Sequence, residues 1–517
     1  KRIMKKIYFS LMLLCAMAFT SCSMDKAPYG SLDDNTAIEK EKDLRQFRNA
    51  LYTNLRAVTS GSWLYLSDIQ MDEFHGLISN GNRLGQFSNG VITITDGDVS
   101  SKWSGSYSMI ATANAIIERA ANMQASDAFS DKDKIAFAHY DAEAHFVRAY
   151  MYFWLADHFC QSYTQCDPTK AASGLPLTTV YKPTGNLNDY PSRSTLAETF
   201  ALIEEDMQKA YNGLVAYEKS GVKVAKEEAQ PLAYIHSQTV QALQARVALV
   251  KGDWANAAKY AKAVINSGKY KLTTIDDYAK LWTKDEGTEI IFRPLMTAQE
   301  LGSSNGEYYV SESETKADYI PTSAVLNLFW EKFEGDIRAD VFLKQYDNLQ
   351  VEGNSYEAMA FNKFPGNSDL RTGSNNNLMN MSKPFRLSEM YLIVAEAEAR
   401  QDHKEEANKY LNILRSNRIV DYVTENYSEQ KTLLKEIKEE REREFIGEGM
   451  RMSDIRRYGE GFERKPNHDE NEELDAIIVK QGRALKYTAN DYRLTWPIPK
   501  AEIDANPHLA GQQNPGY

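Results

Sequence analysis

Two segments of this chain repeat one arrangement of small and aromatic residues. In each segment an alanine is followed by a second alanine 12 residues later and by a tyrosine 15 residues later: Ala245, Ala257 and Tyr260, and again Ala395, Ala407 and Tyr410. Small residues at helical spacing let two helices pack closely, and a short turn divides each segment in two. Each segment therefore predicts a helix, a turn and a second helix packed against the first.

The repeated template predicts a mainly α fold. Such helix pairs are typical of tetratricopeptide-like units, which we expect near residues 133–160, 237–266 and 384–415. Further helical patterns cover residues 40–58 and 104–123. Because long insertions separate the units, the sequence indicates helix pairs that form a scaffold, with a loop-rich variable region containing a few short strands, rather than a regular solenoid.

The first 21 residues have the pattern of an export signal. Lys5 and Lys6 precede an apolar run over residues 7–20, which is too short for a comfortable membrane span. The sequence Phe19-Thr20-Ser21-Cys22 then resembles a bacterial lipobox, in which the cysteine becomes the lipidated N-terminus, although Phe19 stands where leucine is usual. An ordinary secreted protein with an incidental Cys22 is the alternative.

These motifs divide the chain into three parts. We expect a lipoprotein signal peptide over residues 1–21, a lipidated tether over 22–35 and a single domain over 36–517. A lipid on Cys22 would anchor the domain to a membrane surface.

The charge balance excludes nucleic acid as a partner. The chain has 60 Lys and Arg against 72 Asp and Glu, a net charge of -12, and no basic block offsets the excess of acid. A groove that follows a phosphate backbone needs such a block.

Two cysteines remain in the predicted domain, Cys160 and Cys166. Their spacing of six in an exported protein permits a local disulfide. Two free thiols are the alternative. No Cys/His cluster with metal-ligand spacing surrounds them, and we expect no metal and no cofactor.

Catalytic signatures are weak. The chain has no H-E-x-x-H motif and no Walker A loop, and its single G-x-S-x-G match at residues 302–306 lies in a polar loop rather than between a strand and a helix. The charged stretch 439–444 has the alternation of a solvated helix face. The stretch 448–457 is interpreted as an internal ion-pair network that closes two helices. No enzymatic activity is therefore expected.

Two turn-rich regions, near residues 68–103 and 297–382, are expected to form the ligand face. Loops held by a rigid frame commonly carry binding residues. Sugar sites stack on aromatic rings and bind hydroxyls through Asn, Asp and Arg, which selects nine candidates: Phe74, Asn80, Asn82, Arg83, Phe87, Asn305, Tyr308, Tyr309 and Tyr319. The alternative for each aromatic residue is burial beneath its own loop.

Several segments together resemble the SusD/RagB family, the surface lipoproteins of Bacteroidetes nutrient-uptake systems. They are AEAHFVRAY at residues 142–150, RLSEMYL at 386–392, REREFIGEGMR at 441–451, and the tail segments 497–499 and 513–517. With the lipobox, they span nearly the whole mature chain in the family's order. The resemblance implies an α-helical body with four tetratricopeptide-like helix pairs and a variable ligand face.

The resemblance also implies a location and a partner. The protein would be a cell-surface lipoprotein of the outer membrane that closes over a SusC-like TonB-dependent transporter as a hinged lid. It would bind an oligomeric nutrient without catalysis. An oligosaccharide is the first choice of ligand and an oligopeptide, as for RagB, is the second. A surface glycosidase or peptidase on a helical scaffold is a third hypothesis.

Overall fold

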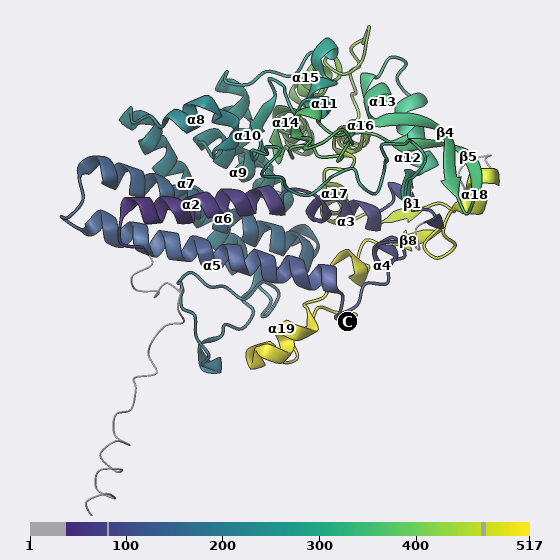
Figure 1. Cartoon of the computed structure of the whole chain (residues 1–517). Helices are drawn as coiled ribbons and strands as arrows, with labels where there is room; N and C mark the ends of the chain where they lie inside the picture. The colour runs from purple at the N-terminus through teal and green to yellow at the C-terminus, as the bar shows by residue number, and fades with distance from the viewer. Residues whose placement is uncertain (1–37, 80–81, 467–471) are drawn as a thin grey trace, which may run out of the picture.

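The computed structural model describes residues 38–79, 82–466 and 472–517. Helices α2 (Glu41–Val58), α5 (Gly97–Ala125) and α6 (Asp131–Phe159) pack side by side (Figure 1). The Ser130 hydroxyl caps α6 by accepting a hydrogen bond from the Asp133 amide at 3.2 Å, and the Asp133 carboxylate accepts one from the Ser130 amide. The helices predicted over 40–58 and 104–123 are thus confirmed, whereas the unit expected near residues 133–160 is one continuous helix, α6, rather than a helix pair.

The two repeated segments form the predicted helix pairs. They are α9 (Ser237–Lys251) with α10 (Trp254–Asn266), and α14 (Leu387–Arg400) with α15 (Lys404–Arg415). Gly252, at a φ of 73°, ends α9, and the Asp253 side chain starts α10 by accepting from the Asn256 amide. The template alanines Ala257, Ala395 and Ala407 are all fully buried, as close helix packing requires.

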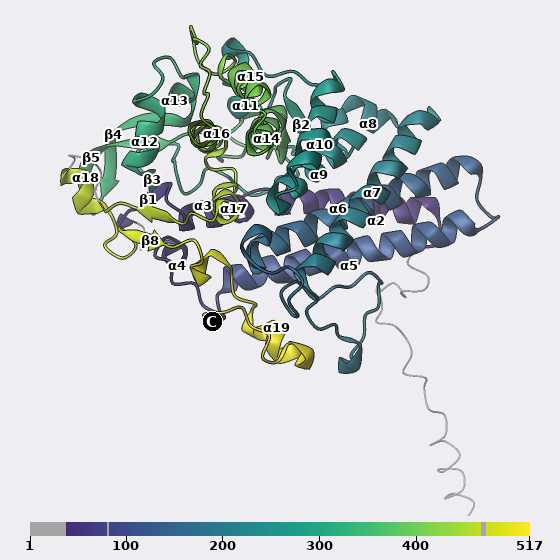
Figure 2. The same cartoon turned by 180° about the vertical axis from the view of Figure 1, so that it is seen from behind.

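One helix packs on the next through the body of the molecule. Helix α7 (Leu196–Ser220) lies between α6 and α9, and α16 (Gln430–Phe445) follows α14 and α15 (Figure 2). The shorter helices are α3 (Ser62–Gln70), α4 (Gly85–Ser88), α8 (Ala225–Ala229), α11 (Lys280–Thr283), α12 (Ser323–Trp330), α13 (Ile337–Phe342), α17 (Arg451–Tyr458), α18 (Glu472–Ile477) and α19 (Lys500–Ala505). No helix in the described ranges is both long and apolar enough to cross a bilayer.

The strands form small antiparallel pairs. They are β1 (Phe74–Gly76) with β3 (Tyr319–Pro321), β2 (Ile290–Phe292) with β6 (Phe385–Arg386), β4 (Leu343–Val351) with β5 (Asn354–Phe361), and β7 (Phe462–Arg464) with β8 (Leu485–Tyr487). Both views place β1, β4, β5 and β8 at the end of the molecule opposite α8 (Figures 1 and 2). The few short strands expected in the variable region are thus present, with β2 in the apolar stretch 290–292.

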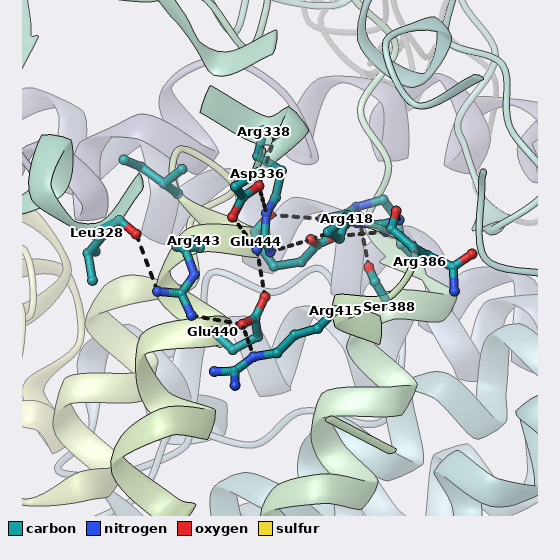
Figure 3. A network of polar contacts seen from close by, with 12 residues as sticks. Leu328, Asp336, Arg338, Arg386, Ser388, Arg415, Arg418, Glu440, Arg443 and Glu444 are labelled. Atoms are coloured by element: carbon teal, nitrogen blue, oxygen red, sulfur yellow. Dashed lines mark hydrogen bonds and ion pairs between the residues drawn. The ribbon is translucent and has the colours of Figure 1, made fainter. Parts of the chain in front are cut away.

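A core of charged residues crosses the helical body. We call Glu289, Asp336, Arg338, Arg386, Arg415, Arg418, Glu440, Arg443 and Glu444 the buried ion network (Figure 3). Glu444 pairs with Arg338 at 3.1 Å, Arg386 at 2.7 Å and Arg418 at 3.0 Å. Glu440 pairs with Arg415 at 2.7 Å and Arg443 at 2.8 Å. These ion pairs connect α16 with α13, β6 and α15.

The solvated helix face predicted for residues 439–444 is wrong for most of that stretch. Glu440, Arg443 and Glu444 are 0% exposed, and Arg441 is 2% exposed. Burial by itself would raise the pKa of Glu444, but Arg418, Arg386 and Arg338 hold that pKa well below its ordinary value. The alternation of charges within residues 439–444 does not reveal that arginines from other elements pair with these carboxylates.

The internal ion pairs predicted for residues 448–457 are present. Glu448 pairs with Lys363 at 2.7 Å, and Asp454 pairs with both Arg441 at 3.0 Å and Arg457 at 2.8 Å. The pair between Arg441 and Asp454 fixes α17 against the C-terminal part of α16. The charged stretch is thus part of the interior of the helical body.

Candidate ligand-binding face

The two turn-rich regions meet in space. Strand β1 comes from the first region and β3 from the second, and they pair antiparallel with Phe74 opposite Pro321 and Gly76 opposite Tyr319. The Leu77 amide extends the pairing by donating to the Asp318 carbonyl at 2.8 Å. A pairing between residues more than 240 positions apart needs the whole scaffold to place it, which explains why local sequence signals did not predict it.

Three candidate residues cluster beyond this pairing. The side chain of Arg83 forms an ion pair with Asp318, and its guanidinium lies 4.6 Å from the centre of the Tyr308 ring. Tyr319 donates from its hydroxyl to the Arg83 carbonyl at 2.6 Å, which holds the backbone of the first loop. The sequence candidates Arg83, Tyr308 and Tyr319 are therefore brought together by the fold.

We call Tyr65, Arg83, Glu307, Tyr308 and Asp318 the Arg83 face. Tyr65 of α3 lies 4.9 Å from Tyr308, ring centre to ring centre, and donates from its hydroxyl to Glu307 at 3.0 Å. The Arg83 side chain is 49% exposed and Glu307 is exposed, whereas Asp318 is buried. The face thus presents a cation, a carboxylate and a half-buried tyrosine to solvent.

The electrostatics of the face keep it charged at neutral pH. Burial lowers the pKa of Arg83, but the hydrogen bond and charge of Asp318, together with Tyr308 and Glu307, raise it overall. Burial and the charge of Glu307 raise the pKa of Tyr308. Arg83 is therefore a permanent donor and Tyr308 a neutral hydroxyl. Such donors and acceptors suit the hydroxyls of a sugar or the amides and carboxylates of a peptide.

Five candidates are buried in the interior, so the prediction that they contact the ligand directly is wrong. They are Phe74, Phe87, Asn305, Tyr309 and Tyr319, each between 0% and 2% exposed. Phe74 packs on Tyr309 at 4.7 Å and on Phe361 at 5.1 Å, and Phe87 packs on Trp496. Asn305 accepts from the Gly61 amide at 2.7 Å. Apolar burial drives these rings inward even though the sequence around them is turn-rich.

Three more predicted positions have different outcomes. Asn82 is half-buried with a φ of 54°, and its backbone amide donates to the Ser79 carbonyl at 3.3 Å. The prediction for Asn80 falls outside the described residues, as does the lipidation of Cys22. Asn82 lies beside Arg83 and stays a candidate for the exposed face.

The disulfide alternative for Cys160 and Cys166 is not realised in the structure. Both are free thiols, with Cys160 buried at the end of α6 and Cys166 half-buried. Burial raises the pKa of Cys160 to about 11. A thiol with that pKa is a poor nucleophile, and Cys160 serves as a small apolar core residue.

Sequence reasoning missed two kinds of residue. Tyr65, Glu307 and Asp318 join the face through tertiary contacts, and nothing in their local sequence marks them. The second kind is an exposed aromatic residue outside the Arg83 face. Trp330 is 52% exposed at the end of α12, while Phe329 beside it is buried. Val325, Leu326 and Phe329 make the buried stripe of that helix, and Trp330 lies off the stripe, a signal that helical periodicity could have supplied.

Buried carboxyl groups lie beneath the face. Asp68 in α3 and Glu73 just before β1 are 0% and 1% exposed. Asp68 accepts from the Gly449 amide at 2.8 Å, and neighbouring Asp72 pairs with Arg451 at 2.7 Å. Burial raises the pKa of Asp68 to about 7 and raises that of Glu73 well above its ordinary value. Among the described residues no group of His, Cys, Asp and Glu could hold a metal ion.

Comparison with known proteins shows which family of proteins has this helical fold. Residues 24–234 match a family model described as "Starch-binding associating with outer membrane", and residues 333–517 match the model of the SusD family. A SusD superfamily protein from Bacteroides thetaiotaomicron has 27% identity and a TM-score of 0.76, over 92% of this chain and 100% of its own. The helix-rich fold is thus that of the SusD superfamily.

Two further proteins match over most of their length. "SusD-like protein P2" of Formosa agariphila is 26% identical over 99% of each chain. The surface glycan-binding protein A of Bacteroides fluxus has the same fold, with 20% identity and a TM-score of 0.67 over 93% of this chain and 100% of its own. The chain belongs to the SusD family.

Proposed function

We propose that this chain is a non-catalytic, cell-surface nutrient-binding lipoprotein. It captures oligosaccharides at the Arg83 face and delivers them, as a lid, to a SusC-like TonB-dependent transporter of the outer membrane. The observation that carries the proposal is the β1–β3 pairing, which joins two distant loops into one exposed polar face in a chain of the SusD family. The family model described as starch-binding and the glycan-binding relative support a saccharide ligand.

The lipobox supports the location. Cys22 would carry the lipid, residues 1–21 would be removed and residues 22–35 would be the tether between membrane and domain. The match to a family described as associating with the outer membrane supports the same location. Labelling of cells with a lipid precursor should yield a lipidated protein, and Cys22→Ser should abolish the label.

An oligopeptide is the second candidate ligand, and one observation favours it. Arg83 covers one side of the Tyr308 ring and Tyr65 packs against that ring from α3, so Tyr308 does not present a free surface for stacking on a sugar. The exposed charges of Arg83 and Glu307 would suit peptide termini and side chains.

Native mass spectrometry tests the choice directly. The full-length chain in detergent is incubated with neutral oligosaccharides from partially hydrolysed starch, xylan and mannan, and separately with a tryptic digest. Retained masses spaced by sugar units support oligosaccharide capture. Retained peptides replace the first proposal by the second. Masses of cleaved products that accumulate with time would instead show an enzyme.

A further inference from the structure

A second concave surface lies on the helical side of the molecule. The loop of residues 176–191 follows α6, lies beneath α5 and runs beside α19 (Figures 1 and 2). Between this loop and α19 is a groove with a volume of about 570 Å³. That volume is within the range of roughly 300–1,000 Å³ that is usual for small-molecule sites. We call it the 176–191 groove, and none of its lining residues belongs to the Arg83 face.

The buried residues of α5 and α6 hold the loop backbone in place. Asn114 donates to the Thr178 carbonyl at 3.1 Å, and Arg148 donates to the Thr179 carbonyl at 3.2 Å. Tyr152 both donates to the Thr178 carbonyl at 3.0 Å and accepts from the Thr178 amide at 2.7 Å. Asn114, Arg148 and Tyr152 are between 0% and 3% exposed. An irregular loop fixed by buried side chains loses little entropy when it binds.

The ends of the loop are fixed as well. Pro176 bridges to Arg193, and Arg193 donates to the Gln512 carbonyl at 2.9 Å. On the far side, Asn506 donates to the Pro191 carbonyl at 2.9 Å. The loop and the C-terminal segment therefore form two walls of one preorganised groove.

The chemistry of the lining selects the kind of ligand. Thr178, Thr179 and Thr184 contribute hydroxyls, and Tyr107 and Tyr190 contribute aromatic rings. Lys182 and Asp189 neutralise each other in an ion pair of 3.1 Å, so no net cation is present for an anionic ligand. Glu502 on the opposite wall is partly buried, and burial raises the pKa of its carboxyl group.

An extended peptide fits this groove poorly. Recognition by strand addition requires free backbone groups along one edge. Here the carbonyls of Pro176, Thr178 and Thr179 already accept hydrogen bonds from Tyr107, Asn114, Tyr152 and Arg148. Recognition must then come from hydroxyls, rings and one carboxyl group. These are the groups that bind neutral polyhydroxylated ligands.

We propose that the 176–191 groove is a second ligand site, which takes a neutral oligosaccharide against Tyr190, the threonine hydroxyls and Glu502. The inference rests on the proposed capture of oligosaccharides and adds a site remote in sequence from the Arg83 face. Tyr190 is the stacking residue, since Tyr107 already packs its ring against Trp103 at 5.1 Å. Two sites on one chain raise avidity for a long glycan without new contacts at either site.

Native mass spectrometry of the full-length chain tests the second site. The probes are the neutral oligosaccharide pools from starch, xylan and mannan. We expect two bound equivalents in the wild type, and one equivalent both in Tyr190→Ala with Glu502→Gln and in Arg83→Ala with Tyr308→Ala. Affinity at the groove, measured by calorimetry in the Arg83→Ala, Tyr308→Ala background, should fall at least tenfold when Tyr190 is replaced by alanine.

A matched variant separates stacking from loop support. Tyr190→Phe keeps the ring but loses the hydroxyl that donates to the Thr184 carbonyl at 3.2 Å. We expect Tyr190→Phe to bind within threefold of the wild type. Equal loss in Tyr190→Phe and Tyr190→Ala, or an altered melting temperature in both, would overturn the stacking role.

The remaining outcomes distinguish the two proposals. A single equivalent that is lost only in the Arg83 and Tyr308 variant overturns the groove and leaves the proposed function intact. A single equivalent that is lost only in the groove variant overturns the Arg83 face. Retention of tryptic peptides that depends on Tyr190 overturns the saccharide class, and no retention of any saccharide overturns both proposals.

Discussion

The buried ion network and the Arg83 face use the same residue types in opposite settings. Both pair arginine with carboxylate side chains, and both join elements that are far apart in the sequence. In the network Arg338, Glu440 and Glu444 are 0% exposed, whereas at the face the Arg83 side chain is 49% exposed. Because the network is buried, its ion pairs serve to hold the helices in place. Exposure leaves the second set free to exchange water for a ligand.

The largest expected effect comes from breaking the network. Glu444→Ala leaves Arg338, Arg386 and Arg418 without a shared buried partner. Removing one member of a buried pair costs about 3–5 kcal/mol, because the remaining charge is uncompensated. Urea unfolding should show that loss in the free energy of unfolding. Glu307→Ala, at an exposed carboxylate, is the control, and a change below about 1 kcal/mol in Glu444→Ala would contradict the structural role.

The next effect depends on pH and concerns Asp68, which lies between the two regions. Its pKa of about 7 when folded exceeds the ordinary value of 3.8. Below about pH 4 the Asp68 carboxyl is protonated in both the folded and the unfolded state, so its full contribution to the free energy of unfolding is present. As pH rises from about 4 to 7 the unfolded state releases its proton first, and the free energy of unfolding falls by an amount on the order of 4 kcal/mol.

Asp68→Asn removes this titration and retains an oxygen to accept from the Gly449 amide. Denaturant unfolding at several pH values should give a flatter profile for the variant between pH 4 and 7. Asp189→Asn, at an exposed carboxylate, is the matched control and should keep the wild-type slope. Parallel profiles for Asp68→Asn and wild type would show that Asp68 is ionised in the folded protein.

A smaller effect is expected at the Arg83 face, and it should appear in binding rather than in stability. Arg83→Ala and Tyr308→Ala should each weaken ligand binding at least tenfold, which is about 1.4 kcal/mol. Arg83→Ala should change the free energy of unfolding by less than about 1 kcal/mol, because the Arg83 side chain is 49% exposed. Calorimetry with the ligand found by mass spectrometry measures the first quantity. Unchanged affinity in both variants would remove the face from the site.

The smallest effect is expected at the free thiols. Because Cys160 and Cys166 are not bonded, dithiothreitol should leave the melting temperature unchanged. Cys166→Ser, at a half-buried position, should change the free energy of unfolding by about 0.5 kcal/mol or less. A drop of several degrees in dithiothreitol would indicate a disulfide and contradict the structure.

The scaffold was more predictable than the site. Helix pairs at 237–266 and 384–415 follow from alanine spacing, capping residues and turns, all of which act within a few residues of each other. Residues 270–272, Tyr-Lys-Leu, have a strand-like composition but form no strand. That segment is irregular and has one backbone bond, from the Lys271 amide to the Thr288 carbonyl at 3.0 Å. A three-residue pattern carries too little periodicity to decide its own structure.

The predicted site residues also show that local sequence does not determine burial. The two loop regions meet in the structure, but Phe74, Phe87 and Tyr309 point into the core. Composition identifies a residue that can stack on a ligand, whereas only packing decides whether its ring is covered. Arg83 and Tyr308 stay partly exposed above their buried partners, Asp318 and Tyr65.

The sequence by itself determined the helix pairs, the mainly α class and the motifs of the SusD family, because each depends on local spacing that the chain carries in order. Only the tertiary structure decided which charges are buried. Residues 439–444 have the local pattern of a solvated helix face, yet Arg338, Arg386 and Arg418 reach Glu444 from other elements. A buried carboxylate is stable only when such partners arrive, and their arrival depends on the packing of the whole scaffold.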